Sequence, residues 1–174
     1  SNKIAKAHKA MLEKRANGKM DWRDLPHNQK DVVVDIKGYV DEVKGDIDAF
    51  VVLGIGGSAL GPICVQQAIN HPFYNELSKE KRGGYPKLYV ADNVDPERLS
   101  YLFEVIEPEK TLFTCISKSG STSETMSQFM IIKELLEEKL GKAEAAKHIV
   151  CTTDIEKGNL IKIAKEEGYK TFII

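Results

Sequence analysis

The chain has little of several features that mark special classes of protein. Its 174 residues include three cysteines and four histidines and carry a net charge of −1. Because it has no excess of positive charge, the chain has no electrostatic field that would attract nucleic acid or anionic lipid. No apolar run approaches the roughly 18 residues of a membrane span, and the amino terminus lacks the apolar core of a signal peptide. We therefore expect a cytoplasmic globular protein with neither nucleic acid nor membrane as a partner.

Few side chains are available for metal or disulfide chemistry. No C-x-x-C spacing relates the cysteines, so neither a zinc site nor a disulfide framework is indicated. We expect all three to be small buried hydrophobic residues: Cys64, Cys115 and Cys151. No histidine stands beside a visible nucleophile or acid, which favours structural or surface roles for His8, His27, His71 and His148. The sequence indicates no metal and no cofactor.

Short apolar runs recur along the chain between helical patterns. They predict five strands, at residues 50–53, 88–90, 112–116, 149–151 and 171–174. The runs are continuous rather than alternating, and each interval allows a helical crossover, as in a parallel sheet covered on both faces. With 42% hydrophobic residues the chain has enough apolar material for one core. The predicted fold class is α/β, a three-layer αβα sandwich with a five-stranded parallel sheet.

Helical patterns fill the intervals between the strands. They predict helices at residues 58–70, 95–106, 121–140 and 156–167, and two earlier ones at 4–16 and 30–44. We interpret residues 1–47 as a helical cap that packs on a sheet domain of residues 48–174. In the helix at 121–140, Met126 and Met130 belong to a predicted core stripe and Lys133 is expected to face water. The charged cluster at residues 79–82 is interpreted as a solvated loop tip.

Two glycine- or serine-rich segments follow predicted strands and open predicted helices. Residues 54–61 follow the strand at 50–53, and residues 117–125 follow the strand at 112–116. Ligands of open α/β sheets bind at such carboxyl ends of strands. The first turn of a helix has unpaired N–H groups and a partial positive charge, and glycine lets the backbone approach an anion closely. Both segments therefore indicate anion binding.

The residue types in the two loops suit one shared phosphate group. At the start of the predicted helix 58–70, Gly57 offers a backbone without a side chain and Ser58 offers a hydroxyl. The second loop adds one cation and a set of hydroxyl donors: Lys118, Ser117, Ser119 and Thr122. A purely structural role stays open for each loop. The glycines of the first loop also allow a helix to pack closely on a strand, and the second loop could be a helix cap. Ser121 and Glu124 also fit a capping box, which is compatible with phosphate binding.

A dinucleotide site is the competing interpretation of the first loop. Gly54, Gly56 and Ala59 satisfy the G-x-G-x-x-G/A fingerprint. That fingerprint also requires an acidic residue about 20 positions later to hold a ribose, and the nearest candidates, Glu76 and Glu80, fall in a polar loop. No Walker A string is present either. An NAD-binding Rossmann domain therefore remains a less favoured hypothesis.

The two loops resemble those of a known family. Gly-Ile-Gly-Gly-Ser-Ala-Leu-Gly-Pro at residues 54–62 and Ile-Ser-Lys-Ser-Gly-Ser-Thr-Ser-Glu-Thr at 116–125 are similar to the phosphosugar loops of the glucose-6-phosphate isomerase family. Residues 22–26 and 90–96 also resemble family segments of a bacterial type. The resemblance implies a flavodoxin-like sugar isomerase (SIS) domain and the cofactor-free interconversion of glucose 6-phosphate and fructose 6-phosphate in glycolysis and gluconeogenesis. It assigns the phosphate to Ser58, Ser117, Ser119 and Thr122, with Gly57 and the backbone near Lys118 assisting.

The acid and base chemistry of that family has no match in this chain. The family's G-G-R arginine, glutamate base, histidine and ring-opening lysine correspond to no residue here. The chain begins Ser-Asn, like the remnant of a removed tag, and its last run ends inside a predicted strand. We therefore expect a phosphate-binding fragment without catalytic residues or turnover, from a parent isomerase that is a homodimer. A sugar-phosphate-sensing SIS domain of a regulator remains the alternative.

Overall fold

The computed structural model describes residues 2–174, in two compact units. The first unit ends at Asp41 and the second runs from Glu42 to Ile174. The first is helical, with α1 (Asn2–Ala16), a 3-10 turn (Asp21–Arg23), α2 (Leu25–Asn28) and most of α3 (Lys30–Val43), so both helices predicted here are confirmed. No residue of these helices is buried. Arg15 and Asp24 form an ion pair of 2.7 Å that joins the end of α1 to the residue before α2.

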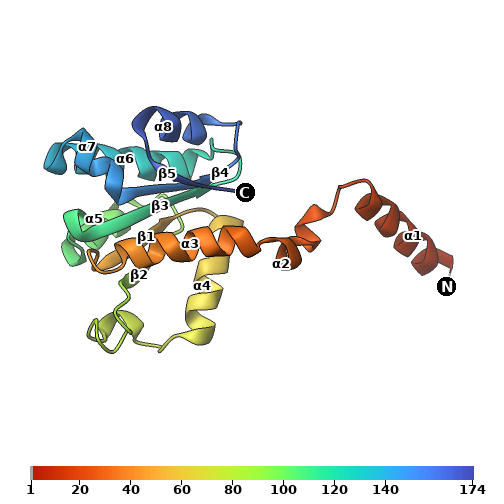
Figure 1. The fold of residues 1–174 in the computed structure, drawn as a ribbon, viewed down its shortest axis with the longest axis horizontal. Coiled ribbons are helices and arrows are strands. Elements are labelled where there is room, and N and C mark those ends of the chain that lie inside the picture. Colours follow the sequence, from red (N-terminus) through yellow and green to blue (C-terminus); the bar gives the residue numbers. More distant parts are fainter. Residues whose placement is uncertain (1) are drawn as a thin grey trace. The chain divides into compact units, whose positions relative to one another are not determined.

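The second unit contains one sheet of five parallel strands (Figure 1). They are β1 (Ala49–Leu53), β2 (Lys87–Ala91), β3 (Thr111–Ser117), β4 (Ile149–Thr153) and β5 (Lys170–Ile173), so all five predicted strands are confirmed. The order across the sheet is β2-β1-β3-β4-β5. This is the flavodoxin-like order, in which the chain reverses direction across the sheet between β1 and β3.

Helices connect the strands and cover both faces of the sheet. They are α4 (Gly57–Ile69), α5 (Pro96–Val105), α6 (Ser123–Leu140), α7 (Lys142–Ala145) and α8 (Asn159–Glu167), with 3-10 turns at Tyr74–Glu76, Pro108–Lys110 and Ala146–His148. Figure 1 shows α6 and α8 on one side of the sheet and α4 on the other. The predicted three-layer α/β sandwich is therefore confirmed. In the part of the chain that the structure describes, no helix has the length and apolar character needed to cross a membrane.

The main core lies on the side of the sheet that α5, α6 and α8 cover. Val51 and Leu53 of β1 and Phe113 and Cys115 of β3 point into it, as Cys151 of β4 does. The helices contribute the apolar side chains of Leu99, Phe129, Ile132, Leu136, Leu160 and Ala164. Strand residues of the other parity, such as Val52 and Leu112, are buried toward the opposite face. Burial on both faces explains why the strands read as continuous apolar runs.

Helix α4 has no charged residue, yet its outer side faces solvent. Leu60, Val65 and Ile69 expose 62%, 56% and 75% of their surface, and Ala59 on the inner side is fully buried. Cys64 lies on the outer side and is exposed, so its predicted burial is wrong. The reason is that an apolar helix gives no pattern from which its inner side can be recognised. Cys115 and Cys151 are buried as predicted.

Two predictions for α6 also need correction. Met130 is 48% exposed and belongs to no core stripe, whereas Met126 packs against the core. The Lys133 side chain is only 15% exposed, because it forms ion pairs with Glu137 at 2.6 Å and with Glu167 at 3.4 Å. These partners keep its ammonium protonated and raise its pKa, with the Glu137 hydrogen bond as the largest cause. A charged residue on a predicted polar face therefore links α6 to the end of α8.

The free edge of β2 is occupied by side chains. The Asn75 amide donates to Leu88 O at 2.7 Å and its Oδ1 accepts from Leu88 N at 2.8 Å. Asn75 thus copies the paired hydrogen bonds of a neighbouring strand. Two residues along, Arg98 donates to Val90 O at 3.2 Å. These contacts cover backbone groups that an edge strand would otherwise present for pairing.

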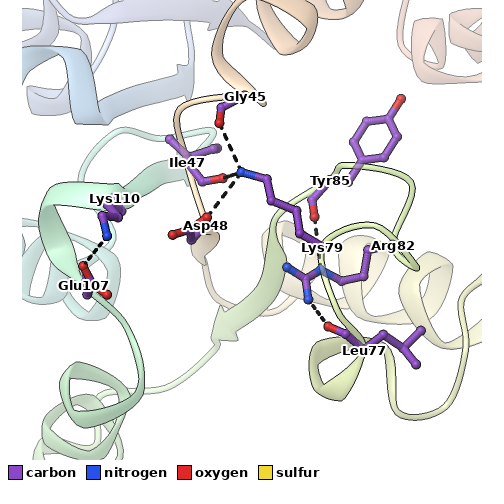
Figure 2. A network of polar contacts seen from close by, with 9 residues as sticks. All are labelled: Gly45, Ile47, Asp48, Leu77, Lys79, Arg82, Tyr85, Glu107 and Lys110. Carbon is purple, nitrogen blue, oxygen red and sulfur yellow. Dashed lines mark hydrogen bonds and ion pairs between the residues drawn. The ribbon is translucent and has the colours of Figure 1, made fainter.

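The charged cluster at residues 79–82 is not a solvated loop tip. Figure 2 shows the Lys79 ammonium between Gly45 O, Ile47 O and the Asp48 carboxylate, at 3.1, 2.9 and 3.3 Å. Arg82 is 8% exposed and donates to Leu77 O and Tyr85 O. The prediction failed because the carbonyls that bind Lys79 lie more than 30 positions earlier in the chain. Lys79 fixes the segment that leads into β1.

Replacing Lys79 with methionine should destabilise the chain by about 1 kcal/mol, since charged hydrogen bonds are lost while the apolar stem remains. Urea unfolding of Lys79→Met measures this change. Lys81→Met is the matched control, because Lys81 is exposed and its side chain has no partner among the described residues. Equal midpoints for the two variants would contradict the assigned role of Lys79.

Thiol reactivity should follow burial. Burial raises the pKa of Cys151 to about 12 and raises that of Cys115 further, so neither forms a reactive thiolate in the folded chain. A thiol reagent should label Cys64 alone under native conditions and all three cysteines in urea, as counted by mass spectrometry. Rapid native labelling of a second cysteine would show that the strands around Cys115 and Cys151 open more easily than the structure implies.

Candidate functional site

The two predicted anion loops leave the same edge of the sheet. Strands β1 and β3 are parallel neighbours, with Leu53 in register with Cys115. Adjacent strands lie about 4.8 Å apart, so the loop after Leu53 and the loop after Ser117 start next to each other. They leave the carboxyl ends of the strands at the reversal point of this strand order, where open α/β sheets bind ligands.

The first loop is a compact turn closed by glycines. A Cβ at Gly54 would lie 2.9 Å from the Ser58 Cβ, so only glycine lets α4 begin this close to β1. Gly56 has φ 55° and ψ −118°, and its carbonyl accepts from the N–H groups of Ala59 at 3.0 Å and Leu60 at 2.9 Å. The close helix packing that was left open as a structural role is thus present at Gly54. This packing does not compete with anion binding at the start of α4.

Different polar groups of Gly57 and Ser58 are available at the start of α4. The Ser58 N–H donates to Ile55 O at 3.1 Å, which leaves its hydroxyl as the available donor. The Gly57 N–H has no backbone acceptor within residues 2–174. Gly57 is exposed and Ser58 half-buried, so a ligand has access to both. They can offer an anion one amide and one hydroxyl.

Three hydroxyls of the second loop meet at Thr122. Thr122 Oγ1 lies 3.2 Å from Ser117 Oγ and 3.3 Å from Ser119 Oγ. Ser117 is buried at the end of β3, whereas Ser119 is exposed. Lys118 lies between them in the sequence, is exposed and forms no ion pair in the described part of the chain. The structure therefore brings together three of the predicted hydroxyls, and Lys118 belongs to the same loop.

The capping box predicted for Ser121 and Glu124 is wrong. Helix α6 starts at Ser123, its N-cap is Thr122, and the Thr122 side chain makes no capping hydrogen bond. The Thr122 hydroxyl is engaged with the two serines, and the Ser121 N–H donates to Ser119 Oγ at 3.3 Å. The hydroxyls of the loop thus contact one another, and within the described residues no N-cap side chain accepts from the first N–H groups of α6.

Thr125 adds an unpaired hydroxyl in the first turn of α6. Its side chain is 1% exposed, and Oγ1 has no hydrogen-bond partner among the described residues. A buried hydroxyl without a partner is costly. The sequence predicts Thr125 as one of the hydroxyl donors of this loop, although the family resemblance does not assign it to the phosphate.

Strand β4 and the start of helix α8 form hydrogen bonds with the backbone of the second loop. The sequence did not predict these contacts. Thr153 Oγ1 donates to Ser117 O at 2.7 Å, and the N–H groups of Asn159 and Leu160 donate to Gly120 O at 3.0 and 2.9 Å. The predicted helix start at residue 156 is wrong, because residues 154–158 form a turn that places the α8 N-terminus against Gly120. The glycine before Asn159 was the available signal.

The turn before α8 is organised by Asp154. Its carboxylate accepts from the N–H groups of Glu156 at 2.9 Å and Lys157 at 2.8 Å. These two backbone hydrogen bonds are the largest causes that hold the pKa of Asp154 below its ordinary value, and the Lys157 and Lys118 charges act in the same direction. The carboxylate therefore stays ionised near neutral pH and keeps the turn in place.

Two further features of the described residues lie outside this arrangement. No group of three or more metal-ligating side chains gathers anywhere in residues 2–174. A hollow of about 330 Å³ lies over β2 and α5, lined by Tyr89, Arg98, Tyr101 and Gln128 among others. None of the predicted phosphate-binding residues lines it. The two loops instead form an exposed site at the edge of the sheet, apart from this hollow.

The arrangement suits a doubly charged tetrahedral anion. Hydroxyls and helix-start amides donate, and Lys118 adds a positive charge. Ser117, Ser119 and Thr122 are in contact, while Gly57 and Ser58 share their edge of the sheet. No hydrogen bond joins the two loops within the described chain. A phosphate held by both would therefore bridge them.

Comparison with known proteins identifies relatives along almost the whole chain. The family model for phosphoglucose isomerase matches residues 14–170. A glucose-6-phosphate isomerase of Carboxydothermus hydrogenoformans is 49% identical over 172 residues, and one of Acetivibrio thermocellus is 40% identical over 176. Each alignment covers 99% of this chain but only 37% and 39% of the relative. The chain thus spans well under half the length of these curated relatives.

Solved structures agree on the fold. The crystal structure of a hypothetical protein from Thermus thermophilus superposes with a TM-score of 0.82 and 33% identity, over 98% of this chain and 38% of that one. A glucose-6-phosphate isomerase from Chlamydia trachomatis gives a TM-score of 0.67 over 83% of this chain and 25% of that one, and at 22% identity it supports the fold alone. Since the family model covers residues 14–170, the chain belongs to the phosphoglucose isomerase family.

Proposed function

We propose that this chain is the phosphate-binding part of an aldose–ketose isomerase that interconverts glucose 6-phosphate and fructose 6-phosphate. The sugar phosphate binds through its phosphate group to the loops that follow β1 and β3. In the first loop the phosphate is bound by Gly57 and Ser58. In the second loop it is bound by Ser117, Lys118, Ser119 and Thr122. The supporting observation is that these loops leave neighbouring strands at one edge of the sheet, in a chain of the phosphoglucose isomerase family.

The phosphate is the non-reacting end of such a substrate. Holding it fixes the position of the carbons where the proton is transferred, so that binding energy is used for orientation. The reaction needs no organic cofactor or metal, and the chemical step is a proton transfer by an acid and a base. The acid and base that the family resemblance implies match no residue of this chain. We therefore expect residues 1–174 alone to bind the ligand without turning it over.

The available donors set the expected affinity. A charge-assisted hydrogen bond contributes about 1.5–3 kcal/mol, and association costs about 4 kcal/mol or more. About four such bonds leave a net of a few kcal/mol, which corresponds to dissociation constants near millimolar. A tighter complex would need contacts to the sugar, for which the two loops provide no obvious groups.

This chain belongs, in our proposal, to a longer isomerase. The sheet domain of residues 48–174 carries the ligand, and the helical segment of residues 1–47 packs on it. The full-length enzyme acts in the cytoplasm as a homodimer in glycolysis and gluconeogenesis. A regulator that senses sugar phosphates would bind the same ligand without converting it. Conversion of glucose 6-phosphate to fructose 6-phosphate by the full-length protein separates the two.

Titration of the 174-residue chain with glucose 6-phosphate should shift the amide resonances of residues 57–58 and 117–122, with a dissociation constant near millimolar. Heteronuclear NMR measures both. Inorganic phosphate should shift the same amides, whereas glucose and NAD should not. Shifts confined to other residues, with these two segments unmoved, would reject the site. A response to NAD without one to phosphate would favour the dinucleotide interpretation.

Replacing Thr122 with valine should weaken phosphate binding about tenfold, the change expected when one charge-assisted hydrogen bond is lost. Valine keeps the shape of the side chain and removes the hydroxyl that Ser117 and Ser119 contact. Ser127→Ala is the control, because Ser127 lies one turn further along α6 and its hydroxyl donates to Ser123 O at 2.8 Å. Isothermal titration of both variants with phosphate makes the comparison. Equal weakening would show that the effect comes from α6 and not from the hydroxyl cluster.

A further inference from the structure

Gly158 lies in the turn before α8 and touches the second loop through its backbone. It has φ 94° and ψ 170°, a combination that is essentially restricted to glycine. A Cβ at this position would lie 2.2 Å from Ser119 O and 2.8 Å from the Gly120 Cα. Backbone atoms cannot move aside as a flexible side chain does. Any other residue here must therefore displace the loop or the turn.

Gly120 forms the other side of this contact. Its φ is 62°, and a Cβ there would lie 3.2 Å from the Gly158 Cα and 3.2 Å from Thr153 Oγ1. Its carbonyl accepts the hydrogen bonds from Asn159 and Leu160. The start of α8 thus binds a carbonyl of the loop, and the two glycines allow the backbones to approach closely enough for those bonds.

The contact bears on the hydroxyl cluster because Ser119 is part of it. Ser119 O is the atom nearest the missing Gly158 Cβ, and Ser119 Oγ contacts Thr122 Oγ1. Pushing Ser119 O away by about 1 Å would move its hydroxyl relative to Thr122. Misplacements of this size in positioning groups have large functional effects. The three atoms nearest the Gly158 Cβ position belong to the backbone of Ser119 and Gly120, and none belongs to a proposed phosphate-binding side chain.

We propose that Gly158 is a positioning residue for phosphate binding: by having no side chain, it lets the start of α8 close on Gly120 and holds Ser119 and Thr122 in place to receive the phosphate. This inference rests on the proposed function. Backbone groups around the start of α8 would thus support a site whose direct contacts come from the loops after β1 and β3. Gly158 sets the conformation of the loop, and the affinity for phosphate follows from that conformation.

The test compares Gly158→Ala with Gly141→Ala. Gly141 has a similar backbone conformation, φ 76° and ψ 157°, and also precedes a helix, but a Cβ there meets no atom within 4 Å. Both variants carry comparable backbone strain, and only Gly158→Ala collides with the loop. We expect Gly158→Ala to bind inorganic phosphate about tenfold more weakly than the unchanged chain. It should also shift the amides of residues 117–122 before any ligand is added. Gly141→Ala should do neither.

The outcomes separate the two proposals. If the unchanged chain fails to bind phosphate, the proposed function is lost, while the ligand-free amide shifts still decide whether Gly158 sets the loop. If phosphate binds and both variants weaken it equally, or neither does, the positioning role is overturned.

A measurement on the unchanged chain covers the case in which Gly158→Ala does not fold. Coupling between two sites is reciprocal, so phosphate should slow hydrogen exchange of the Leu160 amide, which donates to Gly120 O. Exchange at the Gly141 amide, which donates to Glu137 O at 2.9 Å, should stay constant. An unchanged Leu160 rate at saturating phosphate would contradict the proposal.

Discussion

The parallel pairing of β1 with β3 is the constraint on which the proposed site depends. The chain enters the sheet at β1, crosses to β2 on one side and returns to β3 on the other. Because both strands run in the same direction, their carboxyl ends and the helix starts beyond them lie at one edge. No long-range side-chain contact is needed to bring the loops together. Hydrogen bonding between two backbones does so.

The two loops are stabilised in different ways. The first closes on itself: Gly54 lies close against Ser58, and the Gly56 carbonyl accepts hydrogen bonds from N–H groups in the first turn of α4. The second is held from outside, by the Thr153 hydroxyl and by the start of α8. The conformation of the first loop is therefore fixed by contacts among its own residues and the first turn of α4. The second depends on β4 being the next strand in the sheet, so its conformation reports the integrity of a larger part of the fold.

Local patterns in the sequence were sufficient for the architecture. The five apolar runs identified every strand, and the flavodoxin-like arrangement agreed with the observed order. Several errors come from contacts that the local pattern does not show, some of them between segments far apart in the chain. Lys79 reads as a surface lysine until Gly45 and Ile47 are seen beside it. Ser121 reads as a cap until Thr122 is found bonded to the two serines. Cys64 failed for another reason, since an uncharged helix does not reveal which of its sides faces the sheet.

The contact between Asn75 and Leu88 has a consequence for how this sheet can grow. A strand from another molecule that tried to add beside β2 would first have to displace an amide already making both hydrogen bonds at that position. The sheet therefore has a closed border on that side, made by the side chains of Asn75 and Arg98. Removing the Asn75 side chain would leave the Leu88 N–H and C=O open to pairing with another strand, although nothing in the folded core would have changed.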